Sequence, residues 1–198
     1  KLFFEVCLYK AMHLVIHPSI YEEESDKLKI RIKKLLDDCN EELMKKWERL
    51  PKVVSPSHMN ILQSANRVDE VGEASSLSVN VLLANSRQAQ HSNIISEIKS
   101  LMKTWRNRTL TLADDYSHWM DIHHWRIHHF AATVKLLRRW ETFPSDQIQH
   151  IHLALHTAAV SEEQLARAAR KRGLFSVAQE SLNRLHTLPA VLPADADS

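Results

Sequence analysis

The sequence predicts an all-α protein in which antiparallel helices stack as a repeat array. Apolar residues recur at three- and four-residue spacings along most of the chain, the pattern of one helix face packed on a core. Only 2 glycines and 6 prolines occur in 198 residues, so few positions suit the tight turns of a many-stranded sheet. Apolar residues make up 44% and charged residues 25%, close to the globular average. We therefore expect a folded helical chain with a sizeable core.

Residues 1–72 are expected to form three helices. The first covers about residues 2–16 and ends before Pro18, and the second begins at Ser25 as its cap and ends before Pro51. The residues expected to face the core are Phe3, Phe4, Cys7, Leu8, Ala11, Met12 and Val15 in the first helix, and Leu28, Ile32, Leu35, Cys39, Leu43, Met44 and Trp47 in the second.

The third helix is expected to begin at Ser57 as a candidate cap and to continue toward Gly72. Its core positions are Met59, Leu62, Ala65, Val68 and Val71. From there the periodicity weakens through a serine-rich stretch, a short apolar patch at 79–83 and a polar run. Residues 73–92 are therefore predicted to be a connector, with room for a short helical piece.

Residues 93–189 are expected to be helical again. One helix begins at Ser92 or Asn93, and after a break at 109–113 another begins at Asp114 and Asp115, whose charges suit the dipole of a first turn. The expected core positions are Ile94, Ile95, Ile98, Leu101, Met102 and Trp105, then Trp119, Ile122, Trp125, His129, Ala132, Leu136 and Trp140. Phe143-Pro144 ends that helix, and a short one over Ile148, Ile151, Leu155 and Ala158 follows.

The clearest repeat unit is a helix pair at 161–188. Ser161 and Gln164 have the spacing of a capping box, and Gly173 stands where a left-handed C′ residue is wanted. Small residues that let the two helices approach are Ala166, Ala168, Ala169 and Ala178, and the last helix is expected to turn Val177 or Ala178, Leu182 and Leu185 inward. This layout is typical of a tetratricopeptide-like solenoid. Residues 190–198 are expected to be a tail, and the whole of 1–198 a slab of a longer array.

Charge and composition exclude several kinds of partner and chemistry. The net charge of +2, with both signs interleaved, gives no surface-wide field for phosphate backbones, so no direct nucleic-acid partner is expected. The sequence contains no run of 18 apolar residues, so it predicts no membrane-spanning helix. Two isolated glycines cannot build a phosphate loop, and no Gly-x-Ser-x-Gly motif occurs, so we expect neither a cofactor nor enzymatic activity. Cys7 and Cys39 lie in apolar helix faces and are expected to be reduced packing residues.

Two basic clusters have ordinary structural interpretations. The run from Lys27 to Lys34 is followed by acidic residues at helical spacing, which favours a solvated, mutually braced face. The cluster from Arg167 to Arg172 lies at a helix C-terminus, where the dipole favours cations. An acidic protein partner could also use this second cluster.

The 13 histidines leave one chemical alternative open. His124 and His128 share a helix face at the i, i+4 spacing of a zinc-binding pair, and His123 or His129 could assist. However, Trp125 stands where a hydrolytic zinc helix carries glutamate, and no further ligand is identifiable. The favoured interpretation is that His129 packs inward and the others line a groove or a solvated face.

Five sequence blocks are specific enough to indicate a family. They are Lys103-Thr-Trp-Arg-Asn-Arg108, Asp114-Asp-Tyr-Ser-His-Trp119, Trp125-Arg-Ile-His-His-Phe130, Ala169-Arg-Lys-Arg-Gly-Leu174 and Ser181-Leu-Asn-Arg-Leu-His-Thr-Leu-Pro189. The chain resembles the FAT domain of the pseudokinases in the PI3-kinase-related family. The signature residues by this resemblance are Trp105, Arg106, Asp114, Asp115, Trp119, Trp125, Arg126, His128, His129 and Gly173.

The resemblance implies a non-catalytic scaffold rather than a site. Such pseudokinases are helical solenoids in histone acetyltransferase coactivator complexes, so the implied partners are subunits of those complexes and transcriptional activators, and the implied location is the nucleus. Residues 1–198 would be part of a FAT-type array. A FAT segment of an active kinase of the same family is the nearest alternative, and a zinc-binding domain built on the histidines is a second.

Overall fold

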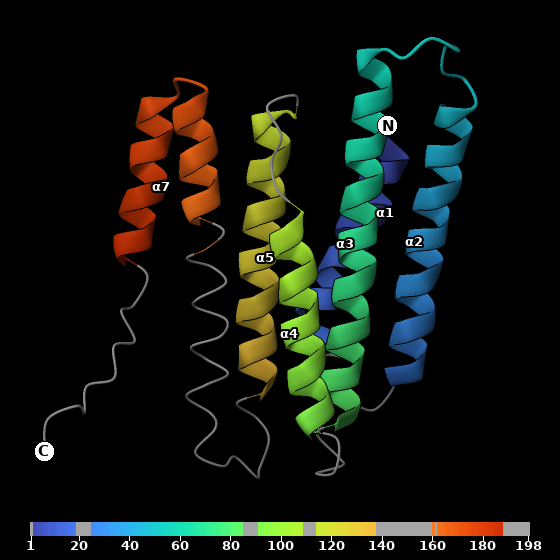
Figure 1. Cartoon of the computed structure of the whole chain (residues 1–198). Coiled ribbons are helices and arrows are strands. Elements are labelled where there is room, and N and C mark those ends of the chain that lie inside the picture. The colour runs from blue at the N-terminus through green and yellow to red at the C-terminus, as the bar shows by residue number, and fades with distance from the viewer. Residues whose placement is uncertain are drawn as a thin grey trace, which may run out of the picture. The chain divides into compact units, whose positions relative to one another are not determined.

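The computed structural model describes residues 2–18, 25–84, 91–108, 114–137, 160 and 162–187. These residues are almost entirely helical and contain no strand, so the all-α helical-repeat prediction is confirmed for them (Figure 1). The chain divides into two compact units, one of residues 1–101 with 135–142 and one of residues 102–134 with 143–198.

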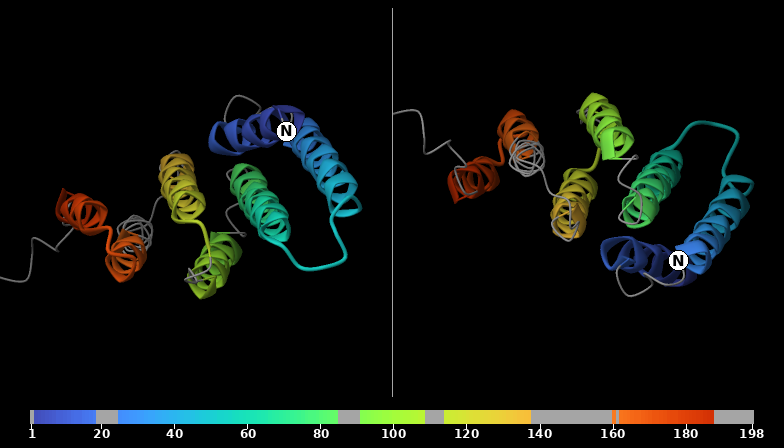
Figure 2. Two further views of the ribbon diagram at one scale, coloured as in Figure 1. Left: turned by 90° about the horizontal axis from the view of Figure 1, so that it is seen from above. Right: turned by 90° about the horizontal axis from the view of Figure 1, so that it is seen from below.

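The first unit is built on three antiparallel helices, α1 (Leu2–Ile16), α2 (Ser25–Trp47) and α3 (Pro56–Ala84). Each of the three packs on the other two, and Figures 1 and 2 show α2 and α3 joined at one end with α1 beside them. The fourth helix, α4 (His91–Asn107), begins in this unit, where Asn80 Nδ2 donates to Glu97 Oε2 over 2.9 Å.

The predicted core faces of α1 and α2 are largely confirmed, but their edges are wrong. The buried apolar residues are Phe4, Cys7, Leu8, Ala11, Leu14 and Val15 on α1 and Leu28, Ile32, Cys39 and Leu43 on α2. Phe3, Met44 and Trp47 are exposed instead. An apolar stripe gives the direction of a face but not its width, because the width depends on how many neighbours the helix has. Leu14 completes the α1 face at helical spacing from Ala11.

The prediction of a connector at 73–92 is wrong for residues 73–84, because α3 continues without a break past Gly72 to Ala84. Buried Ala74, Leu77 and Val81 extend the three- and four-residue spacing beyond Val71. The serines that suggested a loop are accommodated inside the helix: Ser75 Oγ donates to the Gly72 carbonyl over 2.7 Å.

The start of α3 also differs from the prediction. The helix begins at Pro56, which suits the first helical position, and the Ser55 carbonyl accepts from the His58 N–H over 3.0 Å. Ser55, not Ser57, therefore occupies the cap position.

The second unit contains the end of α4, most of α5 (Tyr116–Leu137), a helix over 162–171 and α7 (Phe175–Thr187). Asp115 begins α5 as predicted, since its Oδ1 accepts from the Ser117 N–H over 3.0 Å. Of the predicted core positions on α5, Ala132 is half-buried, and the others are buried: Trp119, Ile122, Trp125, His129 and Leu136. Trp140, Phe143-Pro144, the helix at 145–158, the Ser161 cap and the tail at 190–198 lie outside the described residues.

The turn between the 162–171 helix and α7 confirms the role predicted for Gly173. Its φ is 74°, the left-handed region, and the Gly173 N–H donates to the Arg170 carbonyl over 3.1 Å. The Leu174 N–H donates to the Ala169 carbonyl over 3.0 Å, which completes a Schellman motif. On α7, Ala178 and Ser181 are buried while Leu182 is exposed, so the inward placement predicted for Leu182 is wrong.

Gly173→Ala is expected to lower the free energy of unfolding by about 1–2 kcal/mol, the cost of a left-handed conformation for an L-residue. Nothing lies within 4 Å of an added Cβ there, so the loss of stability reports the backbone conformation alone and not a steric clash. Equilibrium urea denaturation measures it.

Gly72→Ala is the matched control and should act in the opposite direction. Gly72 lies inside α3, and an added Cβ would meet only Leu36 Cδ1 at 3.7 Å, an ordinary contact. Alanine should therefore stabilise the helix by about 0.5–1 kcal/mol. Equal effects of the two substitutions would contradict this account of Gly173.

Candidate functional site

Half of the residues predicted as family signatures lie in one buried aromatic cluster of the second unit, which consists of Trp105, Trp119, Trp125, Arg126 and His129 together with Phe130. Trp105, at the end of α4, is only 1% exposed. Its ring meets His129 at 5.6 Å and Phe130 at 5.4 Å between centroids, both edge-on. The Trp125 ring also lies near His129, with their centroids 5.8 Å apart and the rings tilted by 35°. Edge-to-face pairs such as those of Trp105 add stability beyond the area that they bury.

Arg126 is a buried cation within this cluster, with 2% of its surface exposed. Its guanidinium carbon lies 5.5 Å from the Trp105 ring centroid and 5.8 Å from that of Trp119. Tryptophan faces attract cations most strongly where water is excluded. Arg126 therefore ties the end of α4 to the first turns of α5.

His123 lies one helical turn from Trp119, with their ring centroids 6.0 Å apart. The side chain is 1% exposed, and neither ring nitrogen has a hydrogen-bond partner among the described residues. Burial first, then the nearby charges of Arg126 and His124, lowers the pKa of His123 to about 3. The imidazole is therefore neutral at physiological pH.

The histidine pair considered for zinc is placed differently. His124 is half-buried and His128 is exposed, while His123 and His129 are buried. Across the part of the chain that the structure describes, no group of three or more His, Cys, Asp or Glu side chains could hold a metal ion. Zinc needs four ligands in a structural site and three in a catalytic one.

A second, polar cluster joins the helix over 162–171 to α7, and these two helices form the helical hairpin of the second unit. Arg184 on α7 donates from Nε to Glu162 Oε1 over 3.2 Å, from Nη1 to Glu180 Oε1 over 2.9 Å and from Nη2 to Ser181 Oγ over 3.0 Å. Glu162 and Ser181 are buried, so the contacts of Arg184 with these two residues are partly shielded from water, whereas Glu180 is exposed. Burial also raises the pKa of Tyr116, the first residue of α5.

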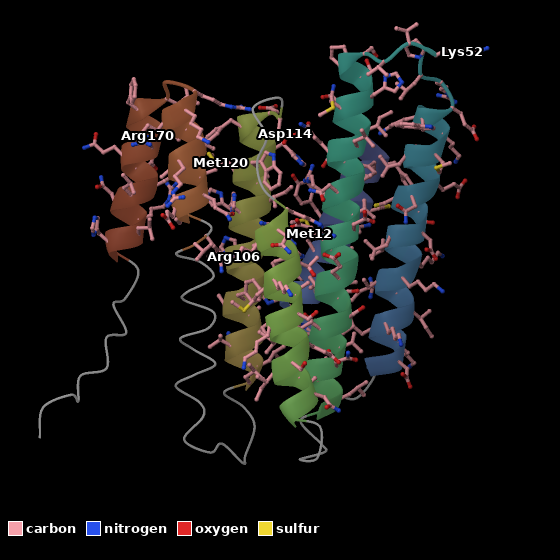
Figure 3. The ribbon with its side chains drawn as sticks, viewed as in Figure 1. Met12, Lys52, Arg106, Asp114, Met120 and Arg170 are labelled. Carbon is pink, nitrogen blue, oxygen red and sulfur yellow. The ribbon has the colours of Figure 1, made fainter. Side chains whose placement is uncertain are left out.

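Arg172 links the same hairpin to α5. Its guanidinium donates to the carbonyl oxygen of Asp114, which Figure 3 labels at the beginning of that helix. The basic cluster from Arg167 to Arg172 therefore has members that make contacts within the second unit, since Arg167 also pairs with Glu163.

The remaining predicted signature residues do not converge on a site. Arg106, Asp115, His128 and Gly173 are exposed, and Asp114 is half-buried. The sequence prediction did not identify the burial of His123 and Phe130, and it missed the Glu162–Arg184 pair. This pair joins residues 22 positions apart, a distance for which helical spacing gives no signal.

The cysteines are buried thiols, as predicted, and form no disulfide. Cys39 Sγ donates to the Phe4 carbonyl over 3.8 Å. Burial raises the pKa of Cys39 to about 12 and also raises that of Cys7, so both thiols stay protonated and are poor nucleophiles. Separately, none of the described helices is long and apolar enough to cross a membrane.

Comparisons with known proteins identify the family of the chain. A family model described as the FAT domain matches residues 1–195. The chain is 32% identical over 94% of its length to the mouse transformation/transcription domain-associated protein. It is 32% identical over 95% of its length to transcription-associated protein 1 of Drosophila melanogaster. A Saccharomyces cerevisiae relative, 27% identical over 85% of the chain, is named SAGA complex/NuA4 acetyltransferase complex subunit TRA1.

The chain spans only 7%, 4% and 5% of the lengths of these three relatives. No solved structure matches it. The family match nevertheless covers nearly every residue, including all five sequence blocks. The chain therefore belongs to the FAT domain family, and its similarity to transcription-associated relatives confirms the resemblance indicated by its tryptophan- and histidine-rich blocks.

Proposed function

We propose that this chain is a non-catalytic scaffold segment of a transcription coactivator pseudokinase, and that its parent protein works in nuclear histone acetyltransferase complexes. The observation that carries the proposal is the similarity to the transformation/transcription domain-associated protein over 94% of the chain. The name of the yeast relative as a SAGA and NuA4 subunit supports the acetyltransferase complexes as the setting. The partners would be subunits of those complexes and transcriptional activators.

The placement of the signature residues supports a structural role. Trp105, Trp119, Trp125, Arg126 and His129 are buried against one another, where they hold helices together instead of facing a substrate. A rigid helical frame presents its outer side chains to partners in a fixed arrangement, which lowers the entropy cost of binding.

The proposal is tested by affinity purification of the tagged full-length parent from a nuclear extract, with mass spectrometry of the co-purified proteins and the untagged parent as control. Acetyltransferase subunits are expected in the tagged sample alone. A preparation of intact parent without any of them would refute the proposal. Phosphoryl transfer by the purified parent, abolished by mutating its kinase-like domain, would contradict the pseudokinase assignment.

A further inference from the structure

The connection between α2 and α3 carries a group of exposed apolar side chains, which we call the α2–α3 tip: Met44, Trp47, Val53 and Val54. Val53 and Val54 are 78% and 84% exposed, and Met44 and Trp47 are 58% and 44% exposed. Single exposed apolar residues are normal on protein surfaces. Four within eleven positions are instead a local concentration of apolar side chains, and the tryptophan among them is a residue type enriched at interaction sites.

The tip is held in a defined conformation. The Glu48 N–H donates to the Met44 carbonyl and the Leu50 N–H to the Trp47 carbonyl, each over 3.0 Å, so the chain leaves α2 through tight turns. Such turns fix the backbone before any partner arrives, which reduces the ordering cost of binding.

His58 fastens the two sides of the tip to each other. Its ring meets the Trp47 ring edge-on at 5.6 Å. Its Nδ1 lies 3.1 Å from both the backbone N and the Oγ of Ser55, the residue that follows the two valines. Trp47 and the valine pair are therefore linked through one side chain in the first turn of α3.

The charge around the tip is mainly positive. Between Met44 and Ser55 there are four cationic residues (Lys45, Lys46, Arg49 and Lys52) and one acid, Glu48, a net charge of 4 − 1 = +3. Two of the cations are engaged within the unit, since Lys45 pairs with Glu41 and Glu42 and Lys46 lies over the Phe4 ring. Arg49 and Lys52 are exposed, and Figure 3 shows the labelled Lys52 side chain reaching outward from the tip.

We propose that the α2–α3 tip docks an acidic amphipathic segment of a partner protein. Apolar side chains of the partner would pack on Trp47, Val53 and Val54, while its carboxylates would lie near Arg49 and Lys52. Tryptophan and arginine are the commonest anchors of protein interfaces. An anionic bilayer fits less well, because two exposed cations are too few for stable attachment to such a surface. The inference rests on the proposed scaffold function for the setting in which such a partner is met.

The probe is a fluorescently labelled synthetic helix with leucines at i, i+3, i+4 and i+7 and glutamates elsewhere, and fluorescence anisotropy measures its binding to the chain. We expect it to bind about tenfold or more tightly than the same peptide with lysines in place of the glutamates, and to weaken as salt rises.

Four variants locate the binding site. The double substitutions Val53→Ser/Val54→Ser and Arg49→Glu/Lys52→Glu should each weaken binding about tenfold or more. Ile30→Ser and Lys33→Glu are matched controls on the exposed side of α2 and should bind as the unchanged chain does. All six positions are exposed, so circular dichroism should show unchanged helicity and thermal midpoint in every variant.

Several results would overturn the inference. Equal affinity for the acidic and basic peptides would do so, as would full binding by the valine double variant. Tip-dependent flotation with phosphatidylserine vesicles, without peptide binding, would assign the surface to a membrane. Tip-dependent dimers in sedimentation equilibrium would assign it to a second copy.

The two proposals fail separately. Loss of acetyltransferase subunits from the parent preparation, with peptide binding at the tip intact, would refute only the scaffold function. Normal recovery of those subunits with no peptide binding would refute only the docking surface.

Discussion

Trp105→Ala is expected to lower the free energy of unfolding of the second unit by about 3–5 kcal/mol, the range for truncating a buried tryptophan. The side chain is 1% exposed and touches His129 and Phe130 edge-on, so the substitution leaves a large cavity beside two rings. It also removes one of the two indole faces beside the buried Arg126 guanidinium, which loses a favourable contact that water cannot replace. Chemical denaturation followed by circular dichroism measures the loss.

Two further substitutions make this result specific. Trp105→Phe keeps an aromatic ring and should recover a large part of the loss, because the cavity is smaller. Trp47→Ala removes the same side chain from the exposed end of α2 and should cost about 1 kcal/mol or less. Similar losses for Trp47→Ala and Trp105→Ala would show that the aromatic cluster does not hold α4 and α5 together.

Helical spacing in the sequence was sufficient to predict most of the described helical segments and, for most of these helices, which face is buried. Leu28, Ile32 and Cys39 on α2 and Trp119, Ile122 and Trp125 on α5 are buried as their spacing predicts. Spacing succeeds here because each of these helices buries one stripe and exposes the rest.

The prediction failed where small or polar residues carry the buried face. In α3 beyond Gly72, the serines and alanines gave too little hydrophobic contrast to extend the helix, although Ala74 is fully buried. On α7, Ser181 is buried and Leu182 is exposed, the reverse of their hydrophobicity. Ser181 can be inside because Arg184 donates a hydrogen bond to its hydroxyl, and such a partner cannot be identified from hydrophobicity alone.

The sequence identified most residues of the aromatic cluster but not how they contact one another. The sequence placed Trp105 on one core face and Trp119 on the next, yet it gave no indication that Arg126 lies buried against both rings. Arginine is usually exposed, so burial of this one depends on which neighbours the fold brings to it. The burial of His123 could not be predicted either. The sequence shows its spacing to the neighbouring histidines, which suggested a metal-binding residue, but it does not show that the fold buries the side chain.

Acid is expected to destabilise the protein through His123. The pKa of this imidazole is about 3 in the folded chain and about 6.5 when unfolded. Between these two values the unfolded state binds a proton that the folded state excludes, so stability is lost as the pH falls below 6.5. The loss should reach roughly 2–3 kcal/mol by pH 4.5, at about 1.4 kcal/mol per pH unit. Urea denaturation at a series of pH values between 7.5 and 4.5 measures it.

His123→Phe should remove this contribution while keeping a planar ring against Trp119. At pH 7.5 the variant should be at least as stable as the unchanged chain, because it no longer buries two ring nitrogens that lack partners among the described residues. His128→Phe, at an exposed position of the same helix, is the matched control and should retain the full acid sensitivity. If His123→Phe lost stability with acid as steeply as the control, the destabilising proton would bind at another residue. The acid sensitivity would then not come from a buried, neutral His123.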